Sequence, residues 1–279
     1  MTTLNYDTYI DVRDSSTRNI PAGTEDLQWV ANTATLIYGD RDAILVDTFL
    51  SIEANNKLID WIKQHKVNLK FIYITHAHSD HFSGAAMLKD AFPNAKVIAT
   101  QATADAIPAV IMPAMVTTVW QQLFPGQVPA HLVGADEVVT DQFELEDHQI
   151  DILSDNFTDT HDSTSLWVPD LKLVVAGDAT YNGVHPFMAE TTLDARKNWI
   201  KVNEHMKTLH PEHVVAGHKV PTNDDDPKIL DETIAYISTF NELAETTHSA
   251  DELYREMMTR YGTRINPGSL WGVSQSIFR

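Results

Sequence analysis

The sequence predicts an α/β fold, and three observations support this prediction. Short apolar segments rich in β-branched and aromatic residues alternate with segments of helical periodicity over about the first hundred residues. The hydrophobic fraction, 43%, and the aromatic fraction, 9%, are those of a globular protein with an extensive core. With 279 residues, the chain is long enough for one large domain and a smaller appendage.

The first half of the chain predicts alternating strands and helices. The expected elements are strands at 34–38 and 43–46, a helix from Ser51 to about residue 64, a strand at 69–74, a helix at 83–92 and a strand at 96–99. The turn Gly39-Asp40-Arg41-Asp42 between the first two strands is typical of a hairpin. The Ser51 side chain is suited to cap the first helix.

The longest stretch without a charged side chain, 106–135, contains four prolines, which argues against a membrane span. It has more apolar side chains than one interrupted helix needs to reach a core. Three interpretations remain open, namely ordinary core packing, an apolar lid beside an active site, and a dimer surface. A homodimer is therefore also left open.

The second half predicts a strand-rich block followed by helices. Strands are expected at 137–139, 143–145, 149–153, 165–168, 171–176 and 213–216, with a helix from Thr191 that closes before Pro211. A polar run, 222–226, precedes Pro227 and two further helical patterns. We therefore expect a catalytic domain at 1–225 and a C-terminal helical appendage at 226–279 packed on it.

The charge and the absence of cysteine exclude several classes of function. The formal net charge is −19, whereas nucleic acids and anionic membranes require clustered basic groups. The chain has no cysteine, which excludes disulfides, thiolate metal sites and cysteine nucleophiles. The first residues lack the basic start and apolar run of a signal peptide, so we expect a cytoplasmic protein with a small-molecule substrate and neither a nucleic acid nor a membrane as partner.

The segment Thr75-His76-Ala77-His78-Ser79-Asp80-His81 carries the strongest chemical signal. It lies on the loop between a predicted strand and a predicted helix, where α/β proteins commonly place chemistry. His76 and His78 share one side of an extended segment, and a bend after them can turn Asp80 and His81 toward a second point. One loop could thus provide two ligands to each of two neighbouring cations.

The remaining ligands must come from elsewhere in the chain. Three places offer a histidine or an aspartate at or near a predicted strand end: Thr160-His161-Asp162, Gly177-Asp178 and Gly217-His218. The glycines before Asp178 and His218 permit close approach of the backbone to a metal ion.

The order of these motifs resembles the metallo-β-lactamase-fold hydrolase superfamily. The pattern is His-x-His-x-Asp-His, then a single His, then Gly-Asp, then Gly-His, and it runs from about residue 34 to His218. The resemblance implies a four-layer αβ/βα sandwich, in which two sheets face one another, helices lie outside and a metal site lies at one sheet edge.

The resemblance also implies a ligand set. His76, His78 and His161 would hold one metal ion, Asp80, His81 and His218 would hold the second, and Asp178 would bridge the pair. Imidazole and carboxylate ligands suit two divalent ions, with zinc favoured and manganese, iron or cobalt as alternatives. The di-iron oxygen-reducing branch of the superfamily carries an acid at the second histidine, so His78 favours a hydrolase.

The implied reaction is hydrolysis of a small ester-like substrate, with a lactone as the best guess, by a hydroxide that bridges two cations. Asp80 would also help to move a proton to the leaving group. Thioesterase, lactamase-like and phosphoester hydrolase activities remain alternatives. A metal-binding protein without turnover is the remote alternative.

Three more side chains are candidates for roles beside the ligands. Asp47 matches the Asp-Thr step that often precedes the metal motif, and we expect it to orient a ligand imidazole. Tyr181 lies three residues after Asp178, a spacing similar to that of the acyl-homoserine-lactone lactonases, whose phenol contacts the substrate carbonyl. A structural tyrosine is the alternative. His185 is either a pocket residue or a hydrogen-bonded loop histidine.

The chain also departs from the superfamily pattern at one ligand. Many members carry a glycine before the downstream histidine and a Pro-Gly turn after it, whereas this chain has Thr160-His161-Asp162-Ser163. We therefore expect a different loop shape beside His161.

Overall fold

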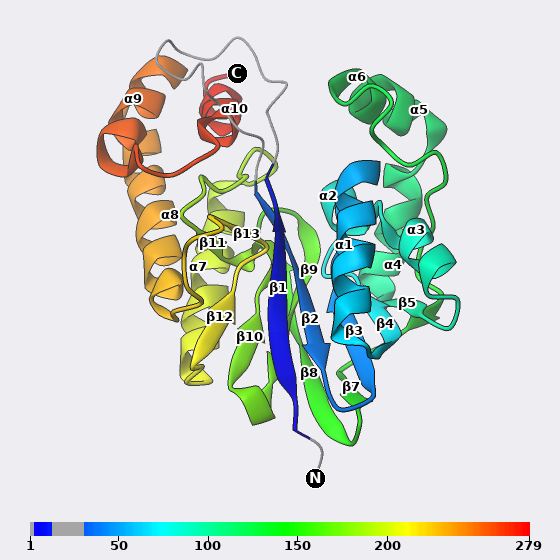
Figure 1. The fold of residues 1–279 in the computed structure, drawn as a ribbon. Coiled ribbons are helices and arrows are strands. Elements are labelled where there is room, and N and C mark those ends of the chain that lie inside the picture. The colour runs from blue at the N-terminus through cyan, green and yellow to red at the C-terminus, as the bar shows by residue number, and fades with distance from the viewer. Residues whose placement is uncertain (1–2, 13–30) are drawn as a thin grey trace.

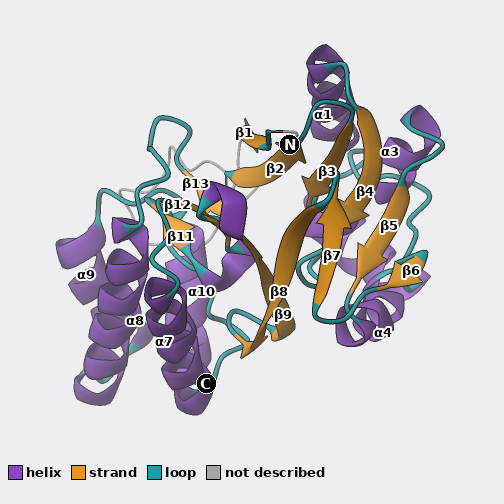
Figure 2. Ribbon diagram, turned by 90° about the horizontal axis from the view of Figure 1, so that it is seen from below, coloured by secondary structure: helices purple, strands orange, loops and turns teal. Residues whose placement is uncertain are grey.

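The computed structural model describes residues 3–12 and 31–279, and these residues form four layers (Figures 1 and 2). Two sheets pack face to face, and helices cover the outer face of each. The larger sheet has the strand order β11 (Tyr181–Asn182), β13 (His218–Lys219), β2 (Asn32–Tyr38), β3 (Asp42–Val46), β4 (Asn68–Tyr73), β5 (Lys96–Ala99) and β6 (Glu137–Val138), with β1 (Asn5–Asp11) paired to β2. The smaller sheet has the order β12 (His213–Val215), β10 (Leu173–Val175), β9 (His161–Val168), β8 (His148–Phe157) and β7 (Gln142–Leu145).

The helices lie on the outer faces of the two sheets. The larger sheet is covered by α1 (Ile52–His65), α3 (Ala85–Ala91) and α4 (Gln101–Val110), and the smaller sheet by α7 (Leu193–Thr208) and α8 (Lys228–Thr246). The short helix α2 (Ser79–Phe82) follows the loop after β4. The predicted four-layer sandwich is therefore confirmed.

Successive side chains along a strand point to opposite faces of the sheet and so belong to different apolar layers. Leu36 and Leu45 pack toward α1, whereas Ile37 and Ile44, their neighbours in the sequence, pack between the two sheets. In the smaller sheet, Val175 faces the layer between the sheets. The period of two in burial is the one that pleated strands impose, and it holds the two sheets at a fixed separation.

Most of the predicted elements are present. The hairpin predicted at 34–38 and 43–46 corresponds to β2 and β3, which pair antiparallel. The Ser51 hydroxyl caps α1 by accepting a hydrogen bond from the Ala54 N–H at 3.2 Å. Ser249 caps α9 (Ala250–Tyr261) in the same way through the Glu252 N–H, also at 3.2 Å.

Several elements were not predicted, among them the strand β1 and the helix α10 (Pro267–Ile277). The strand β1 has an exposed and partly buried pattern, NYDTYID, without a continuous apolar run. The helix α10 begins with a proline and contains two glycines, which weakens its helical signal. Tertiary contacts stabilise both elements, because β1 pairs along its whole length with β2 and α10 packs against α9.

The uncharged stretch 106–135 contributes both to the core and to a cavity wall. After α4 the chain forms α5 (Pro113–Met115), a π-helical turn (Val116–Trp120) and α6 (Gln121–Leu123). Phe124 and Val128 are buried against Leu50, while Met112 and Met115 are exposed. The stretch is therefore neither wholly core nor wholly surface.

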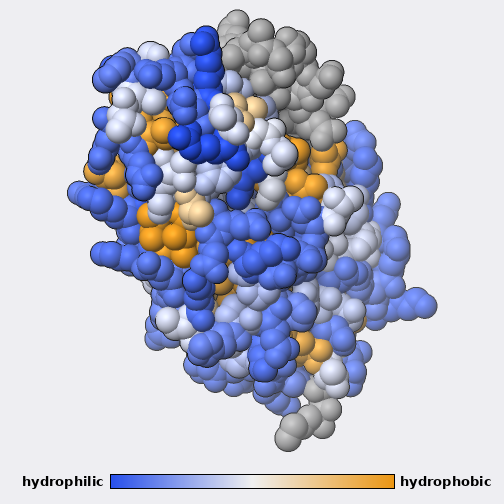
Figure 3. All heavy atoms as spheres, turned by 90° about the vertical axis from the view of Figure 1, so that its left-hand side faces the viewer, coloured by the Kyte–Doolittle hydropathy of each residue, from blue (hydrophilic) through white to orange (hydrophobic). Residues whose placement is uncertain are grey.

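The helices after residue 226 share an apolar core with the middle of the chain. Tyr236, Phe240 and Met257 pack in one cluster with Tyr181 and Trp199. Figure 3 shows the outer face of this region, which is largely hydrophilic with hydrophobic side chains in small separate groups. In the described part of the chain, no helix is long and apolar enough to span a membrane. The division of the chain at residue 225 stays a prediction.

The buried side chain of Glu146, in the turn between β7 and β8, binds the turn between β2 and β3. The Glu146 carboxylate accepts hydrogen bonds from the backbone N–H groups of Asp40 (3.2 Å), Arg41 (2.6 Å) and Asp42 (2.6 Å). Burial raises the pKa of this carboxyl, but the N–H groups of the turn lower it by more, so the net direction is downward. The ionised form therefore stabilises the fold above the ordinary pKa of glutamate, and this contribution is lost as the pH falls below it.

We expect Glu146→Gln to lower the free energy of unfolding by about 1–3 kcal/mol at neutral pH. The amide has one acceptor oxygen where the carboxylate has two, so at least one N–H of the turn loses its partner. Urea unfolding at pH 7 measures the effect, with the exposed neighbour Glu144→Gln as the control. Equal stability of the two variants would show that the carboxylate does not hold the turn.

Candidate metal centre

The loop after β4 and the short helix α2 bring four potential ligands to the edge of the larger sheet. Thr164 anchors this loop, because its N–H and its hydroxyl both donate to the Thr75 carbonyl, at 3.0 and 2.7 Å. His76 lies in the bend after β4, whereas Asp80 and His81 lie in α2. All three of these side chains are buried.

The structure gathers the candidate ligands in two clusters. In each cluster the potential ligand atoms lie within 4.8 Å of one another. The first cluster consists of His76, His78, Asp159 and Asp178, and the second of Asp80, His81 and His218. This division agrees with the expected sharing of the loop between two cations.

Asp178 connects the two clusters. Its Oδ1 lies 3.3 Å from the Nε2 of His81, and its Oδ2 lies 2.9 Å from the Nε2 of His218. Asp178 therefore belongs to the first cluster by position and contacts the second through both oxygens. This is the position expected of a ligand shared by two cations.

The structure does not bring His161 into the first cluster, and this corrects the predicted ligand set. His161 is exposed at the start of β9, where its ring packs against Phe157 with ring centroids 4.2 Å apart. Asp159, two residues earlier, is fully buried, and its Oδ2 lies 2.9 Å from the Nδ1 of His78 and 3.6 Å from the Nε2 of His76. Asp159 thus takes the place that the sequence motif assigns to His161.

The cause of this exchange lies in the β8–β9 hairpin. The pairing register shifts twice, between Ser154 and Asn156 and between Asn156 and Phe157. Asn156 and Asp162 have positive φ, at 58° and 57°. Each irregularity changes which side chains point inward. The run Asp159-Thr160-His161-Asp162, together with the departure from the usual loop pattern, was the available sequence signal for Asp159.

Asp47 holds two of the ligand histidines in orientation, as predicted. Its carboxylate accepts hydrogen bonds from the Thr75 N–H (2.9 Å) and the Thr75 hydroxyl (2.8 Å), and contacts the Nδ1 of His81 at 2.9 Å. Because the Thr75 proton is donated to Asp47, its oxygen accepts from the Nδ1 of His76, 2.9 Å away. In both histidines Nε2 is left to face the clusters.

Asp80 and Tyr181, the two predicted catalytic residues, both line the site. Asn32 donates to the Oδ2 of Asp80 at 2.9 Å. The Tyr181 hydroxyl donates to the Oδ2 of Asp178 at 2.6 Å, and its ring stacks on His218 with centroids 5.1 Å apart. Tyr181 therefore orients Asp178 and His218. His185 is buried, and its Nδ1 pairs with the Tyr236 hydroxyl at 2.8 Å, as expected of a hydrogen-bonded loop histidine.

The electrostatics of the site fit the binding of cations. Burial raises the pKa values of the Asp159 and Asp178 carboxyls, but the nearby histidines lower them by more, so both remain ionised. Burial lowers the pKa of His81, but the carboxylates of Asp178, Asp47 and Asp80 raise it to about 10. In the metal-free protein, protonated imidazoles thus compensate the negative charge of the carboxylates. A bound divalent cation would compensate the same charge.

Unpaired buried atoms give an independent test of whether the residues fit a metal ion. Among the described residues, the buried Nε2 of His76 has no hydrogen-bond partner, and the buried Oδ2 of Asp159 and Oδ1 of Asp178 contact imidazoles of the clusters, His78 and His81. A buried polar atom without a partner is costly, and these three atoms belong to residues of the first cluster, whose potential ligand atoms lie within 4.8 Å of one another. Nitrogen and oxygen ligands of this kind suit zinc and related divalent ions.

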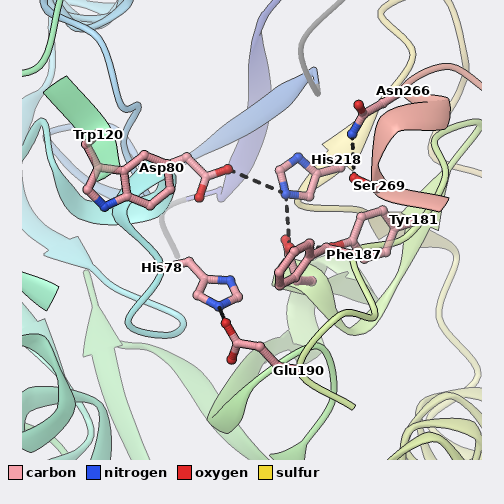
Figure 4. A pocket seen from close by; sticks show the side chains of 10 residues that line it. His78, Asp80, Trp120, Tyr181, Phe187, Glu190, His218, Asn266 and Ser269 are labelled. Atoms are coloured by element: carbon pink, nitrogen blue, oxygen red, sulfur yellow. Dashed lines mark hydrogen bonds and ion pairs between the residues drawn. The ribbon is translucent and has the colours of Figure 1, made fainter. Parts of the chain in front are cut away.

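A cavity of about 220 Å³ opens beside the two clusters (Figure 4). Trp120 stands on one side of it, while Tyr181, Asn266 and Ser269 lie on the other. His78, Asp80, Asp178, Phe187, Glu190 and His218 complete the lining. The potential ligands therefore face a space that a small molecule can enter.

The role of Asp47 in orienting His76 and His81 can be tested by substitution. We expect Asp47→Asn to weaken metal binding about 10–100-fold, because an amide cannot accept from both Thr75 and His81 as the carboxylate does. Asparagine tolerates the positive φ of 62° at this position, so the backbone is preserved. Competition with a chromogenic chelator measures the affinity. Asp60→Asn, at an exposed position of α1, is the matched control. If Asp47→Asn bound the metal as tightly as Asp60→Asn does, Asp47 would not be needed to hold the ligand histidines.

Comparison with known proteins agrees with this geometry. The sequence profile of the Metallo-beta-lactamase superfamily matches residues 27–218. Hydroxyacylglutathione hydrolase 1 of Vibrio vulnificus is 31% identical over 74 residues, which are 26% of this chain and 28% of that protein. Hydroxyacylglutathione hydrolase of Vibrio cholerae is 33% identical over 81 residues, 29% of each chain. These matches span less than a third of the relatives' own length.

Solved structures share the architecture. The metallo-beta-lactamase FIM-1 of Pseudomonas aeruginosa, solved in its mono-zinc form, superposes with a TM-score of 0.62 at 13% identity. The superposition covers 85% of this chain and 95% of that one. At this level of identity, the similarity establishes the fold.

Proposed function

This chain belongs to the metallo-beta-lactamase superfamily, and on that premise we propose that it is a hydrolase that uses two divalent cations, zinc foremost, to cleave an ester-like bond. The observation that carries the proposal is the sharing of Asp178 between the two ligand clusters, beside a cavity. His76, His78, Asp159 and Asp178 would hold one cation, and Asp80, His81 and His218, with Asp178, the other. When bound, the cations would lower the pKa of an attacking water and polarise the scissile carbonyl oxygen.

The protein's own residues position the reaction. Asp80 lines the cavity and is held by Asn32, so one carboxylate oxygen is fixed while the other is available to pass a proton toward the leaving group. Tyr181 contributes through Asp178, because its hydroxyl proton is already donated there. The aromatic side chains of Trp120 and Phe187 limit the water around the reacting bond.

A lactone is the leading substrate class. The cavity is small, and Trp120, Tyr181 and Phe187 contribute aromatic surface to its walls, which suits a compact neutral ester. The spacing of Asp178 and Tyr181 also supports this class, although the Tyr181 hydroxyl is engaged with Asp178. A thioester is the second candidate, favoured by the names of the curated relatives.

We also propose how the rest of the molecule takes part. Residues 226–279 form a helical appendage that completes the cavity of the catalytic domain, 1–225, because Asn266 and Ser269 line the cavity. The proposed partner is a small-molecule substrate, and neither a nucleic acid nor a membrane is part of the proposal.

The proposal is tested with a substrate panel on protein of known metal content. A lactone, a thioester, a β-lactam and a phosphotriester are assayed with zinc-loaded, chelated and reconstituted protein. We expect hydrolysis of the lactone or the thioester that disappears on chelation, returns with metal and is lost in His76→Ala. Hydrolysis that persists in chelated protein, or no hydrolysis of any substrate, would overturn the proposal.

A further inference from the structure

Glu190 places a carboxylate in the cavity wall beside the first cluster. It lies in the segment between β11 and α7, and its side chain is 48% exposed. The Thr160 hydroxyl donates to its Oε2 at 2.8 Å, and the Nε2 of His78 lies 3.5 Å from its Oε1 (Figure 4). Thr160 therefore holds the carboxylate at the wall on which the substrate would lie.

Among residues 3–12 and 31–279, Glu190 has no lysine or arginine as an ion-pair partner. His78 is the only imidazole that contacts it among the described residues, and the Nδ1 of His78 faces Asp159 in the first cluster. A histidine that binds a metal ion is neutral, so His78 would not compensate Glu190 in the loaded protein. No lysine or arginine of the described residues lines the cavity.

The charge balance of the centre adds to this effect. Two divalent cations carry four positive charges. Four carboxylates lie in the two clusters or are hydrogen-bonded to them: Asp47, Asp80, Asp159 and Asp178. The centre is thus near neutrality before Glu190 is counted, and Glu190 makes it negative. With His161 in the place of Asp159, the centre would carry one more positive charge and could attract anions.

We propose that Glu190 sets the charge class of the substrate, so that the cavity takes acyl groups that are neutral or cationic and rejects acyl groups that carry a carboxylate. This inference rests on the proposed hydrolase function and narrows its substrate class. The aromatic walls at Trp120 and Phe187 favour an apolar acyl group, and a cation would gain from the same rings.

The test uses three esters with the same leaving group and similar length. They are para-nitrophenyl butyrate, the para-nitrophenyl monoester of glutaric acid, and the para-nitrophenyl ester of trimethylammoniobutyric acid. In the wild type we expect kcat/KM to rank cationic and neutral above anionic. Glu190→Gln should raise the ratio of anionic to neutral kcat/KM about tenfold, the size expected for one partly screened charge in a cavity wall. Since each ratio is taken within one protein, a change in metal content cancels.

Glu204→Gln, on the exposed face of α7, removes the same charge outside the cavity and should leave the ratio unchanged. A ratio in Glu190→Gln equal to that of the wild type would overturn the inference.

A binding measurement separates this inference from the proposed function. Amides with the same three acyl groups are titrated calorimetrically into zinc-loaded wild-type and Glu190→Gln protein. If no ester is hydrolysed, the proposed function fails, and the affinities still decide the question of charge. Binding of the anionic amide as tight as that of the neutral amide in the wild type would contradict the role of Glu190. Weaker binding that recovers about tenfold in Glu190→Gln would support it.

Discussion

Asp159→Ala is expected to reduce hydrolysis by a factor of about 100 or more, whereas His161→Ala is expected to leave it within about twofold. Asp159 is buried, and its Oδ2 lies 3.6 Å from His76 and 2.9 Å from His78, so its loss removes one carboxylate from the first cluster and one acidic contact from each imidazole. His161 is exposed and contacts Phe157, so its loss changes only the surface of β9. Initial rates on the best substrate of the panel measure both variants.

The comparison needs a variant that preserves the shape of the loop. Asp159→Asn keeps the size of the side chain and its contact with the Thr158 hydroxyl, which donates to Asp159 Oδ1 at 2.9 Å. It should fold as the wild type does and still lose most of its activity, because the negative charge is gone. If Asp159→Asn were fully active while His161→Ala were inactive, the assignment from the sequence motif would be right and the structural one wrong.

Removal of the metal ions is expected to lower the melting temperature by about 10 °C or more. A ligand present at a thousand times its dissociation constant stabilises the folded state by about 4 kcal/mol, and 1 kcal/mol shifts the melting temperature of a protein of this size by about 2–4 °C. Without metal, the buried carboxylates of Asp159 and Asp178 remain close together. Differential scanning calorimetry of zinc-loaded and chelated protein measures the shift.

Two controls accompany the calorimetry. Re-addition of zinc to the chelated protein should restore the melting temperature, which excludes damage by the chelator. His76→Ala should show a smaller shift than the wild type, because one cluster has lost a ligand. Superimposable curves for loaded and chelated wild type would show that metal binding is not coupled to folding.

The regular elements could be predicted because their signals are local. The Ser51 cap, the alternation along β2 and β3 and the turn between them all lie within short segments, and each appears as expected. The strand β1 and the helix α10 have weak local signals, and they form because β2 and α9 offer them partners. Such long-range stabilisation does not show in periodicity.

The candidate site was predictable to the extent that its ligands follow strand ends. The loop after β4 carries four ligands in one motif, and Asp178 and His218 each lie three residues after the end of a strand, β10 and β12 respectively. Their positions could therefore be predicted from the local sequence. Asp159 lies in a hairpin with two register shifts, where an error of two residues exchanges a buried side chain for an exposed one. Only the three-dimensional structure distinguishes Asp159 from His161.

The cavity walls were the least predictable part. Trp120, Glu190 and Asn266 come from three segments far apart in the chain, and none belongs to a recognisable motif. Their meeting depends on how the π-helical turn, the segment before α7 and the start of α10 pack around the centre. The substrate preference must therefore be inferred from the assembled cavity.

The central claim is that two cations bind between His76, His78, Asp159 and Asp178 and between Asp80, His81, His218 and Asp178. Metal content per chain, measured by mass spectrometry after equilibration with zinc and gel filtration, tests it most directly. We expect two zinc ions in the wild type, two in His161→Ala and one in Asp159→Ala. Two ions in Asp159→Ala with one in His161→Ala, or well under one ion in the wild type, would contradict it.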